Sequence, residues 1–215
     1  MKFRMDSPFV TVGMKIANLL ILNFYWIIGC LPIFTIGTST IAAFSVTLKM
    51  AEDREDPGMT KAFWSAYVKN LKHGIPLTLL AGLVLYSVWI DWQMFEKLEG
   101  NPIGFLILAI VAVLFLLVHF LYIFPLEARY ENKLSSALIN SRRICIRFFL
   151  RTLSLVGILL VQVFLFTMNA LMMYIGAFCG PILAIYTTSQ IVMPIFRKIE
   201  GNSMASDGFA ATGET

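Results

Sequence analysis

The longest stretch of this chain without an acidic or basic side chain runs from residue 152 to residue 196. One helical crossing of a bilayer takes about 20 residues, so a stretch of 45 residues has room for two crossings joined by a short turn. Arg151 and Arg197 bound the stretch at its two ends. Because Lys and Arg are retained on the cytoplasmic side of short loops, we expect both ends on that side. The pattern predicts an integral membrane protein whose helices cross in pairs.

The composition agrees with this prediction. The chain is 58% hydrophobic and 14% charged, and its mean hydropathy is +0.77. Soluble domains carry roughly 25% charged residues, so a soluble globular domain is excluded. The net charge of +4 favours the anionic inner leaflet as a partner, and we expect no nucleic-acid binding, because no basic tract is interleaved with aromatic residues. The cysteines (Cys30, Cys145 and Cys179) form no CxxC pair, so we expect no metal site.

Three further charge-free stretches cover residues 16–48, 74–90 and 100–126. Among the segments that connect the charge-free stretches, 91–99 is the only one with more acidic than basic side chains, so we expect it outside the cell. We therefore predict an all-α, polytopic transmembrane bundle of six spans in three hairpins, with both termini cytoplasmic; five spans are the alternative. The expected spans cover residues 8–31, 38–50, 74–91, 102–125, 152–174 and 178–196, within a single domain, 1–199, that precedes a disordered tail, 200–215.

Two turns follow from proline and glycine. A single helix over 16–48 would be about 50 Å long, which exceeds a hydrocarbon core of about 30 Å. Pro32 lacks a backbone donor and Gly37 permits a turn, so the first hairpin should turn between them. The helix that follows is short, and we expect it to be either re-entrant or buried against its neighbours. The third hairpin should turn near Gly176, Gly180 and Pro181.

The connectors over residues 58–72 and 131–150 have amphipathic patterns. Phe63, Trp64 and Tyr67 mark the apolar face of the first one. Helices of this kind lie in the headgroup plane with the apolar side in lipid, so we expect interfacial helices. Their basic side chains are candidates for contact with anionic inner-leaflet lipids or with a partner protein: Lys61, Lys69, Lys72, Arg142, Arg143, Arg147 and Arg151.

Short motifs in the first third of the chain resemble the YesL family of bacterial integral membrane proteins. They are Ser7-Pro8-Phe9, Asn18 to Asn23, Leu31 to Gly37, Thr38-Ser39-Thr40 and Leu48-Lys49, followed by Phe63, Lys69-Asn70 and Lys72. The family is classed by a domain of unknown function. The resemblance implies a bacterial plasma-membrane location and an accessory role in carbohydrate uptake or utilisation, with a carbohydrate transporter or a membrane sensor protein as partner. It transfers no catalytic residue.

Polar side chains at membrane depth are the candidates for function, because their burial is costly unless they face protein or water. They are Asn18, Asn23, Thr38, Ser39, His119, Gln162, Asn169 and Gln190. Asn18 and Asn23 diverge by about 140° around a helix, so they do not converge on one small ligand. We expect hydrogen bonds between helices from these amides. His119 is the one ionisable group in its span; a proton relay is the alternative to a neutral, hydrogen-bonded histidine.

Enzyme signatures are absent from the sequence, which has no HExxH, no GxSxG and no glycine-rich phosphate loop. We therefore expect neither an enzyme nor a cofactor. The leading hypothesis is a non-enzymatic accessory or interaction protein. The alternative is a small transporter or channel component, since Pro32, Pro125 and Pro194 are able to break helices where buried polar groups gather.

Overall fold

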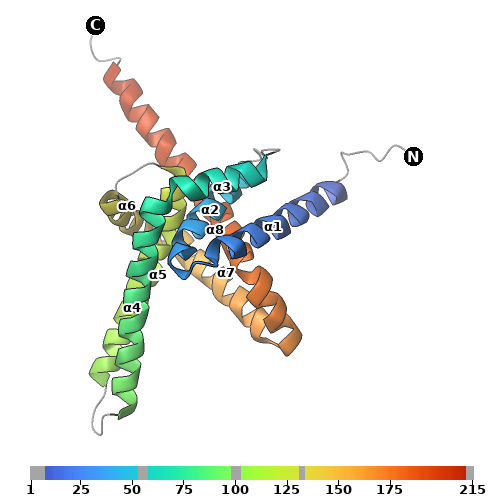
Figure 1. The fold of residues 1–215 in the computed structure, drawn as a ribbon. Coiled ribbons are helices and arrows are strands. Elements are labelled where there is room, and N and C mark those ends of the chain that lie inside the picture. The colour runs from blue at the N-terminus through green and yellow to red at the C-terminus, as the bar shows by residue number, and fades with distance from the viewer. Residues whose placement is uncertain (1–7, 53–57, 98–102, 131–133, 212–215) are drawn as a thin grey trace.

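The computed structural model describes residues 8–52, 58–97, 103–130 and 134–211 (Figure 1). Throughout these residues the chain forms eight α-helices and one 3₁₀ turn, and it contains no strand. The all-α class predicted from the sequence is confirmed. Figure 1 shows a central group of helices from which two helix pairs, α4 with α5 and α7 with α8, project in different directions.

The first two helices are α1 (Pro8–Cys30) and α2 (Ile36–Ala51), and the short turn η1 (Ile33–Thr35) lies between them. Pro32 has extended backbone angles and cannot donate to the preceding turn, which ends α1. The Thr35 hydroxyl lies 2.8 Å from the Gly29 carbonyl oxygen and 2.6 Å from that of Pro32, so it satisfies backbone groups that the break leaves open.

Helix α2 forms the centre of the molecule. Of its 18-residue apolar window 67% is buried inside the protein, against at most 22% for the other long apolar helices. Small residues let its neighbours approach closely: a Cβ added to Gly29 would lie 2.7 Å from Ser39 Oγ, and one added to Gly74 would lie 2.4 Å from the Thr38 nitrogen. Of the two expectations for this short helix, burial against its neighbours is the one observed.

Helix α3 (Met59–Lys69) packs its aromatic face on protein. Phe63 is wholly buried, and its ring lies 5.9 Å from that of Tyr25 on α1 and 5.3 Å from that of Trp64. The prediction that this face lies in lipid is therefore wrong for Phe63, because α1 and α2 cover it. The opposite face of α3 carries the lysines.

Helices α4 (Leu71–Lys97) and α5 (Ile103–Arg129) pack against each other along their length. The start of α4 lies beside the end of α5, where His73 Nδ1 is 2.6 Å from Glu127 Oε2. The two helices are therefore antiparallel.

The acidic segment expected as an external loop, 91–99, is helical as far as Lys97, and its last two residues lie outside the described part of the chain. Asp91 is 8% exposed and therefore buried. The rings of Trp92 and Phe95 stack with centroids 5.9 Å apart. No glycine or proline interrupts the segment before Gly100, so nothing in its local sequence ends the helix.

The C-terminal half contains α6 (Leu134–Arg147), α7 (Phe149–Thr167) and α8 (Ala170–Ala211). The turn between α7 and α8 lies at Met168 and Asn169, so the predicted turn near Gly176, Gly180 and Pro181 is wrong. Asn169 Oδ1 accepts a hydrogen bond from the Met172 N–H at 2.9 Å and thereby caps α8.

The two glycines expected in that turn serve helix packing instead. A Cβ added to Gly176 would lie 2.4 Å from the Cβ of Phe166 on α7, and one added to Gly180 would lie 3.6 Å from the ring of Phe166. Helix α8 also continues through Gly201 to Ala211, in the region for which the sequence predicts a disordered tail. Residues 212–215 lie outside the described chain.

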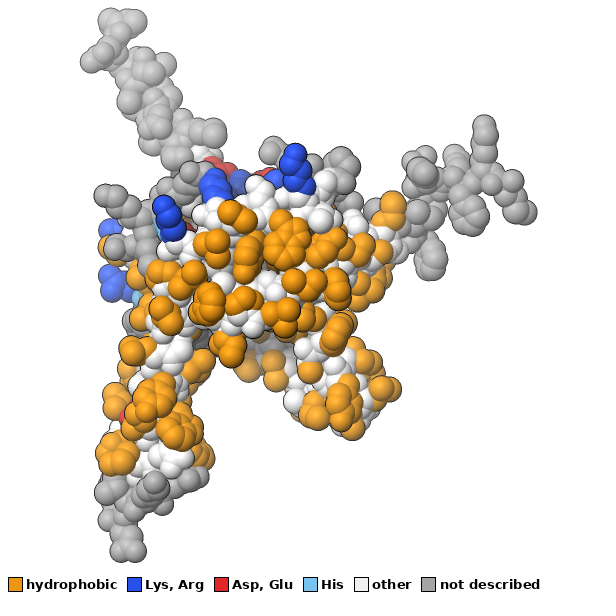
Figure 2. All heavy atoms as spheres, in the orientation of Figure 1, with side chains coloured by type: hydrophobic (Ala, Val, Ile, Leu, Met, Phe, Trp, Pro, Cys, Tyr) orange, Lys and Arg blue, Asp and Glu red, His pale blue; other side chains and the backbone are white. Residues whose placement is uncertain are grey.

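Within the described part of the chain, five helices are long and apolar enough to cross a membrane. They are Val12–Cys30, Ile33–Ala51, Leu71–Phe95, Phe149–Thr167 and Ala170–Gly201. The part of α5 with described side chains adds a shorter apolar segment, Ile103–Val113. Figure 2 shows hydrophobic side chains over the projecting helix pairs, while Lys and Arg side chains gather around the upper edge of that face. This distribution is that of a multi-pass membrane protein.

Candidate functional site

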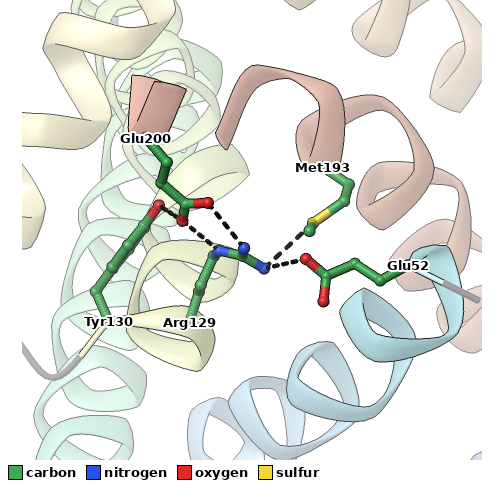
Figure 3. Close-up of polar contacts among 5 residues, drawn as sticks. All are labelled: Glu52, Arg129, Tyr130, Met193 and Glu200. Atoms are coloured by element: carbon green, nitrogen blue, oxygen red, sulfur yellow. Dashed lines mark hydrogen bonds and ion pairs between the residues drawn. The ribbon is translucent and has the colours of Figure 1, made fainter. Parts of the chain in front are cut away.

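A guanidinium at the end of α5 joins three helices that are far apart in sequence (Figure 3). Arg129 donates from Nε and Nη2 to the two carboxylate oxygens of Glu200 on α8, at 2.8 and 3.1 Å. It also donates from Nη1 to Glu52 Oε1, just after α2, at 3.0 Å. The paired bonds to Glu200 have the fork geometry that makes arginine–carboxylate contacts strong. We call Glu52, Arg129, Tyr130 and Glu200 the arginine junction.

Aromatic and sulfur groups enclose this charge. The Arg129 guanidinium lies 6.0 Å from the ring centre of Tyr130 and 5.9 Å from that of Phe196, and its Nη1 lies 3.4 Å from Met193 Sδ. The Tyr130 hydroxyl donates to Glu200 Oε1 at 2.6 Å. With these groups packed around the guanidinium, the Arg129 side chain is 21% exposed.

The ionisation of the junction is stable at neutral pH. Hydrogen bonding to Glu200 raises the pKa of Arg129 above its already high ordinary value, although burial opposes this. Burial raises the pKa of Tyr130 to about 12, and its hydrogen bond to the Glu200 carboxylate adds to the rise. A permanently charged arginine and a neutral phenol make this a structural clamp and not a proton carrier.

A second polar contact lies between α4 and α5, one turn from the junction. The Glu127 side chain is 1% exposed, and its Oε2 lies 2.6 Å from Nδ1 of the half-exposed His73. The two atoms are within hydrogen-bonding distance, and the tautomer of His73 determines which of them donates. The other oxygen, Glu127 Oε1, is buried and has no hydrogen-bond partner in the structure. An unsatisfied buried acceptor of this kind costs about 1–3 kcal/mol, so a donor from outside the chain would be stabilising there.

Between α2, α3 and the end of α5 the surface is hollowed into a cavity of about 400 Å³. We call it the lysine pocket, because Lys49, Lys61 and Lys69 line it. Ser45, Ser65, Asn70 and Glu127 are also in its lining, whereas Lys72 is not. A second cavity of about 370 Å³ lies between α5, α6 and α8 and shares Tyr130 and Glu200 with the junction; Arg143 and Arg147 line it.

The basic residues singled out in the sequence thus separate into groups. Lys61 and Lys69 belong to the lysine pocket, and Arg143 and Arg147 to the second cavity. Arg147 and Arg151 also flank the ring of Phe148, at 5.9 and 6.0 Å from its centre. Lys72 and Arg142 are exposed.

The polar residues at membrane depth lie at separate places between helices. Asn23 donates to the Phe178 carbonyl oxygen on α8 at 2.8 Å, while its own Oδ1 is buried without a partner. Ser39 donates to the Trp26 carbonyl oxygen at 2.8 Å, and Gln162 to that of Gly180 at 3.0 Å. The hydroxyl of Thr38 is buried without a partner. The remaining members do not join a common site: Asn18 and His119 are half-buried, and Asn169 and Gln190 are exposed.

Sequence reasoning missed two contacts. Thr47 on α2 and Ser189 on α8 are fully buried, and their hydroxyl oxygens are 2.7 Å apart. The partners of Arg129 are 71 and 77 residues away along the chain. The available signal for the junction was that Arg129 and Glu52 lie just beyond the ends of charge-free stretches.

No group of three or more His, Cys, Asp or Glu side chains within the described ranges is arranged to hold a metal ion. The cysteines (Cys30, Cys145 and Cys179) are free.

The fold and its five long apolar helices in the described residues define a multi-pass α-helical membrane protein. Residues 19–92 match the family model described as Protein of unknown function, DUF624. The YesL-like family expected from the sequence is a DUF624 family, so the match confirms that resemblance over this part of the chain. No curated protein and no solved structure matches the chain.

Proposed function

We propose that this chain is a six-span protein of the bacterial plasma membrane, with both termini in the cytoplasm, that acts as a non-enzymatic accessory. Its partner in this proposal is a carbohydrate transporter or a membrane sensor protein. The observation that carries the proposal is the arginine junction, because it joins the ends of α2 and α5 to Glu200 of α8 beside two cavities lined with basic residues.

The junction supports the six-span threading. The Arg129 guanidinium contacts both Glu52 and Glu200, so residues 52, 129 and 200 meet at one place. The chain therefore returns to this place after α4–α5 and again after α7–α8. Each of these helix pairs therefore leaves and re-enters on the same side. The lysines and arginines of α3 and α6 lie at that end, and by the positive-inside rule they favour the cytoplasmic side for it.

An accessory role is favoured over transport by the way α2 and α8 meet. The hydroxyl groups of Thr47 and Ser189 are fully buried and hydrogen-bond to each other. Each also lies within hydrogen-bonding distance of a carbonyl oxygen of its own helix. This is the packing of a static helix contact and not of a hydrated path. In this proposal the exposed basic side chains of α6 form the docking surface, and at its end the arginines Arg147 and Arg151 lie against the ring of Phe148.

Site-specific photo-crosslinking in the native membrane tests the proposal. A photoreactive residue replaces Ile146, which is 71% exposed on α6, or Leu160, which is 65% exposed on α7 and serves as the lipid-facing control. We expect position 146 alone to form an adduct with a transporter subunit or a sensor protein, identified by mass spectrometry. Arg143→Glu with Arg147→Glu should abolish that adduct and preserve the melting temperature. Equal adducts from both positions, or none from position 146, would contradict the proposal.

The second candidate, a small transporter or channel component, is favoured by one observation. Asn23 is 1% exposed, and its Oδ1 has no partner at the contact between α1 and α8, near Pro181 of α8. Reconstituted vesicles should be assayed for flux of oligosaccharides and ions. Flux that Asn23→Leu abolishes supports this candidate, and absence of flux in the unmodified protein removes it.

A further inference from the structure

We propose that the second cavity, between α5, α6 and α8, binds one anionic phospholipid, with Arg143 and Arg147 on its phosphate and the start of its acyl chains on the apolar floor. This inference goes beyond the proposed function. It concerns a lipid site within one chain and does not depend on any protein partner.

Two guanidinium groups give the second cavity its positive charge. Arg143 and Arg147 are four residues apart on α6, so they share one face of the helix, and both are exposed and line the cavity. Among the described residues Arg143 has no hydrogen-bond or ion-pair partner, and the contact of Arg147 is with the ring of Phe148, at 5.9 Å. Both groups therefore have donors left for the oxygens of a phosphate, which arginine binds through two parallel hydrogen bonds.

The carboxylate in the described lining, that of Glu200, does not cancel this charge. Both of its oxygens accept hydrogen bonds from Arg129, and Oε1 also accepts one from Tyr130. Even when the charge of Glu200 is counted in full, the lining holds two guanidinium groups against one carboxylate. The cavity therefore favours an anion.

The floor of the cavity is apolar and lies at the edge of the expected hydrocarbon layer. Its apolar side chains are Leu126, Ile144, Phe196 and Ile199. Leu126 and Phe196 are the last residues of the charge-free stretches 100–126 and 152–196. Residues that end membrane-spanning stretches lie near the level at which acyl chains meet headgroups. The guanidinium groups beside them are thus placed for the phosphates of the anionic inner leaflet.

Buried side chains of α6 hold its arginine face in position. Ala137, Ser141 and Cys145 follow one another at intervals of four residues and are all buried. Ala137 packs in one cluster with Ile123 of α5, and Cys145 packs in another with Tyr122 of α5. Because α6 is fixed on this side, its arginine face has a defined position relative to the apolar floor, and the lipid does not have to order the helix.

The two kinds of lining favour a phospholipid over a free anion. A free phosphate would use the guanidinium groups and leave the apolar floor in contact with water, whereas the glycerol and first acyl carbons of a phospholipid would cover that floor. The cavity of about 370 Å³ lies within the usual range of roughly 300–1,000 Å³ for small-molecule sites. Phosphatidylglycerol has the required chemistry, because its phosphate is not offset by a cation of its own.

The lipid site leaves another face of α6 open to a protein partner. Ile146, the position chosen for photo-crosslinking, is 71% exposed and lies outside the described lining of the cavity. Arg142 is exposed and also lies outside that lining. A lipid in the cavity and a protein at position 146 therefore do not exclude each other.

Native mass spectrometry of the purified full chain in detergent measures lipid binding without a protein partner. Phosphatidylglycerol is compared with phosphatidylcholine that has the same acyl chains. We expect phosphatidylglycerol to bind at least about tenfold more tightly, and equal binding of the two lipids would overturn the proposal. Glycerol 3-phosphate at the same concentration should not displace the bound lipid. If it does, the site binds a free phosphate ester, and the assignment to a phospholipid is wrong.

Two double variants that each remove two positive charges locate the site. Arg143→Gln with Arg147→Gln should weaken binding of phosphatidylglycerol at least about tenfold. Arg142→Gln with Arg151→Gln, outside the described lining, should leave it unchanged. The control is matched because Arg147 and Arg151 both contact the ring of Phe148. Equal losses from the two double variants would mean that net charge alone holds the lipid, and would overturn the assignment to this cavity.

A third variant tests the apolar floor. The four arginines are exposed, so both double variants should keep the melting temperature of the unmodified protein. Ile199→Trp retains both guanidinium groups and fills part of the space above the floor, so it should also weaken binding of phosphatidylglycerol. Unchanged binding in a folded Ile199→Trp variant would show that the acyl chains do not lie on this floor.

Discussion

Replacing Arg129 by glutamine tests the arginine junction as the element that ties the ends of α2 and α5 to α8. The substitution removes the three charge-assisted hydrogen bonds that Arg129 donates to Glu52 and Glu200. Exposed ion pairs contribute about 0–1 kcal/mol, and breaking buried ones costs about 3–5 kcal/mol. The Arg129 side chain is 21% exposed, between these limits, so we expect a loss of about 2–3 kcal/mol.

For a chain of this size a loss of about 2–3 kcal/mol corresponds to a fall of roughly 5–10 °C in melting temperature. Differential scanning fluorimetry of the protein in nanodiscs measures it, and Arg142→Gln, an exposed arginine on α6, is the control, with an expected change below about 0.5 kcal/mol. Adding Glu52→Gln and Glu200→Gln to Arg129→Gln should recover part of the loss, because it removes the repulsion between the two carboxylates that shared Arg129. A melting temperature equal to that of the control, or a further fall in the triple variant, would refute this reasoning.

Three further predictions concern packing and ionisation. Gly176→Ala should destabilise the α7–α8 contact, because the added Cβ would lie 2.4 Å from the Cβ of Phe166. Gly180→Ala should be tolerated in the same melting assay, because its Cβ would lie 3.6 Å from the Phe166 ring. Equal effects of the two variants would contradict this packing. Because the pKa of Tyr130 is raised to about 12, its contribution to stability is present below about pH 10 and is lost as the pH rises to 12. The stability difference between the unmodified protein and Tyr130→Phe should therefore be constant below pH 9 and change between pH 10 and 12; a constant difference throughout argues against the raised pKa. A double-mutant cycle with Thr47→Val and Ser189→Ala should give a coupling of about 0.6–1.7 kcal/mol, and zero coupling would mean that the 2.7 Å contact does not stabilise the bundle.

The class of fold was predictable from the sequence because it depends on composition and on local signals. A charge-free stretch too long for one membrane crossing and a proline that cannot donate are visible without any tertiary information. The break at Pro32 was predicted correctly, whereas Pro125 and Pro194, which the sequence also offers as helix breakers, lie inside α5 and α8. The burial of α2 was left as one of two alternatives, since small residues permit close packing but do not say which helices will supply it.

The error at the third turn has a definite physical cause. Glycine serves turns and close helix contacts equally well, so Gly176 and Gly180 do not distinguish between them. In the structure Phe166 on α7 packs against both glycines, so they serve helix packing. The position of Phe166 relative to α8 depends on the tertiary structure and is not visible in the sequence. A local signal for the real turn was present in Asn169, a residue type that favours the start of a helix.

The candidate site was the least predictable part. The arginine junction joins residues that are 71 and 77 apart in sequence, and no periodicity links them. In the same way Lys61 and Lys69 were recognised as a basic face, but the cavity beside them depends on how α3 packs on α1 and α2. Polar residues within the spans were correctly placed as hydrogen-bonding groups between helices in the cases of Asn23 and Gln162.

The central claim is that helix pairs return to one side of the membrane, where the arginine junction and the lysine pocket meet the cytoplasm. Single cysteines at positions 60, 95 and 140, in a chain without its native cysteines, test it by labelling intact cells with an impermeant reagent. The account predicts labelling at position 95 and protection at positions 60 and 140 until the membrane is opened. Protection at position 95, or labelling of positions 60 and 140 in intact cells, would contradict it.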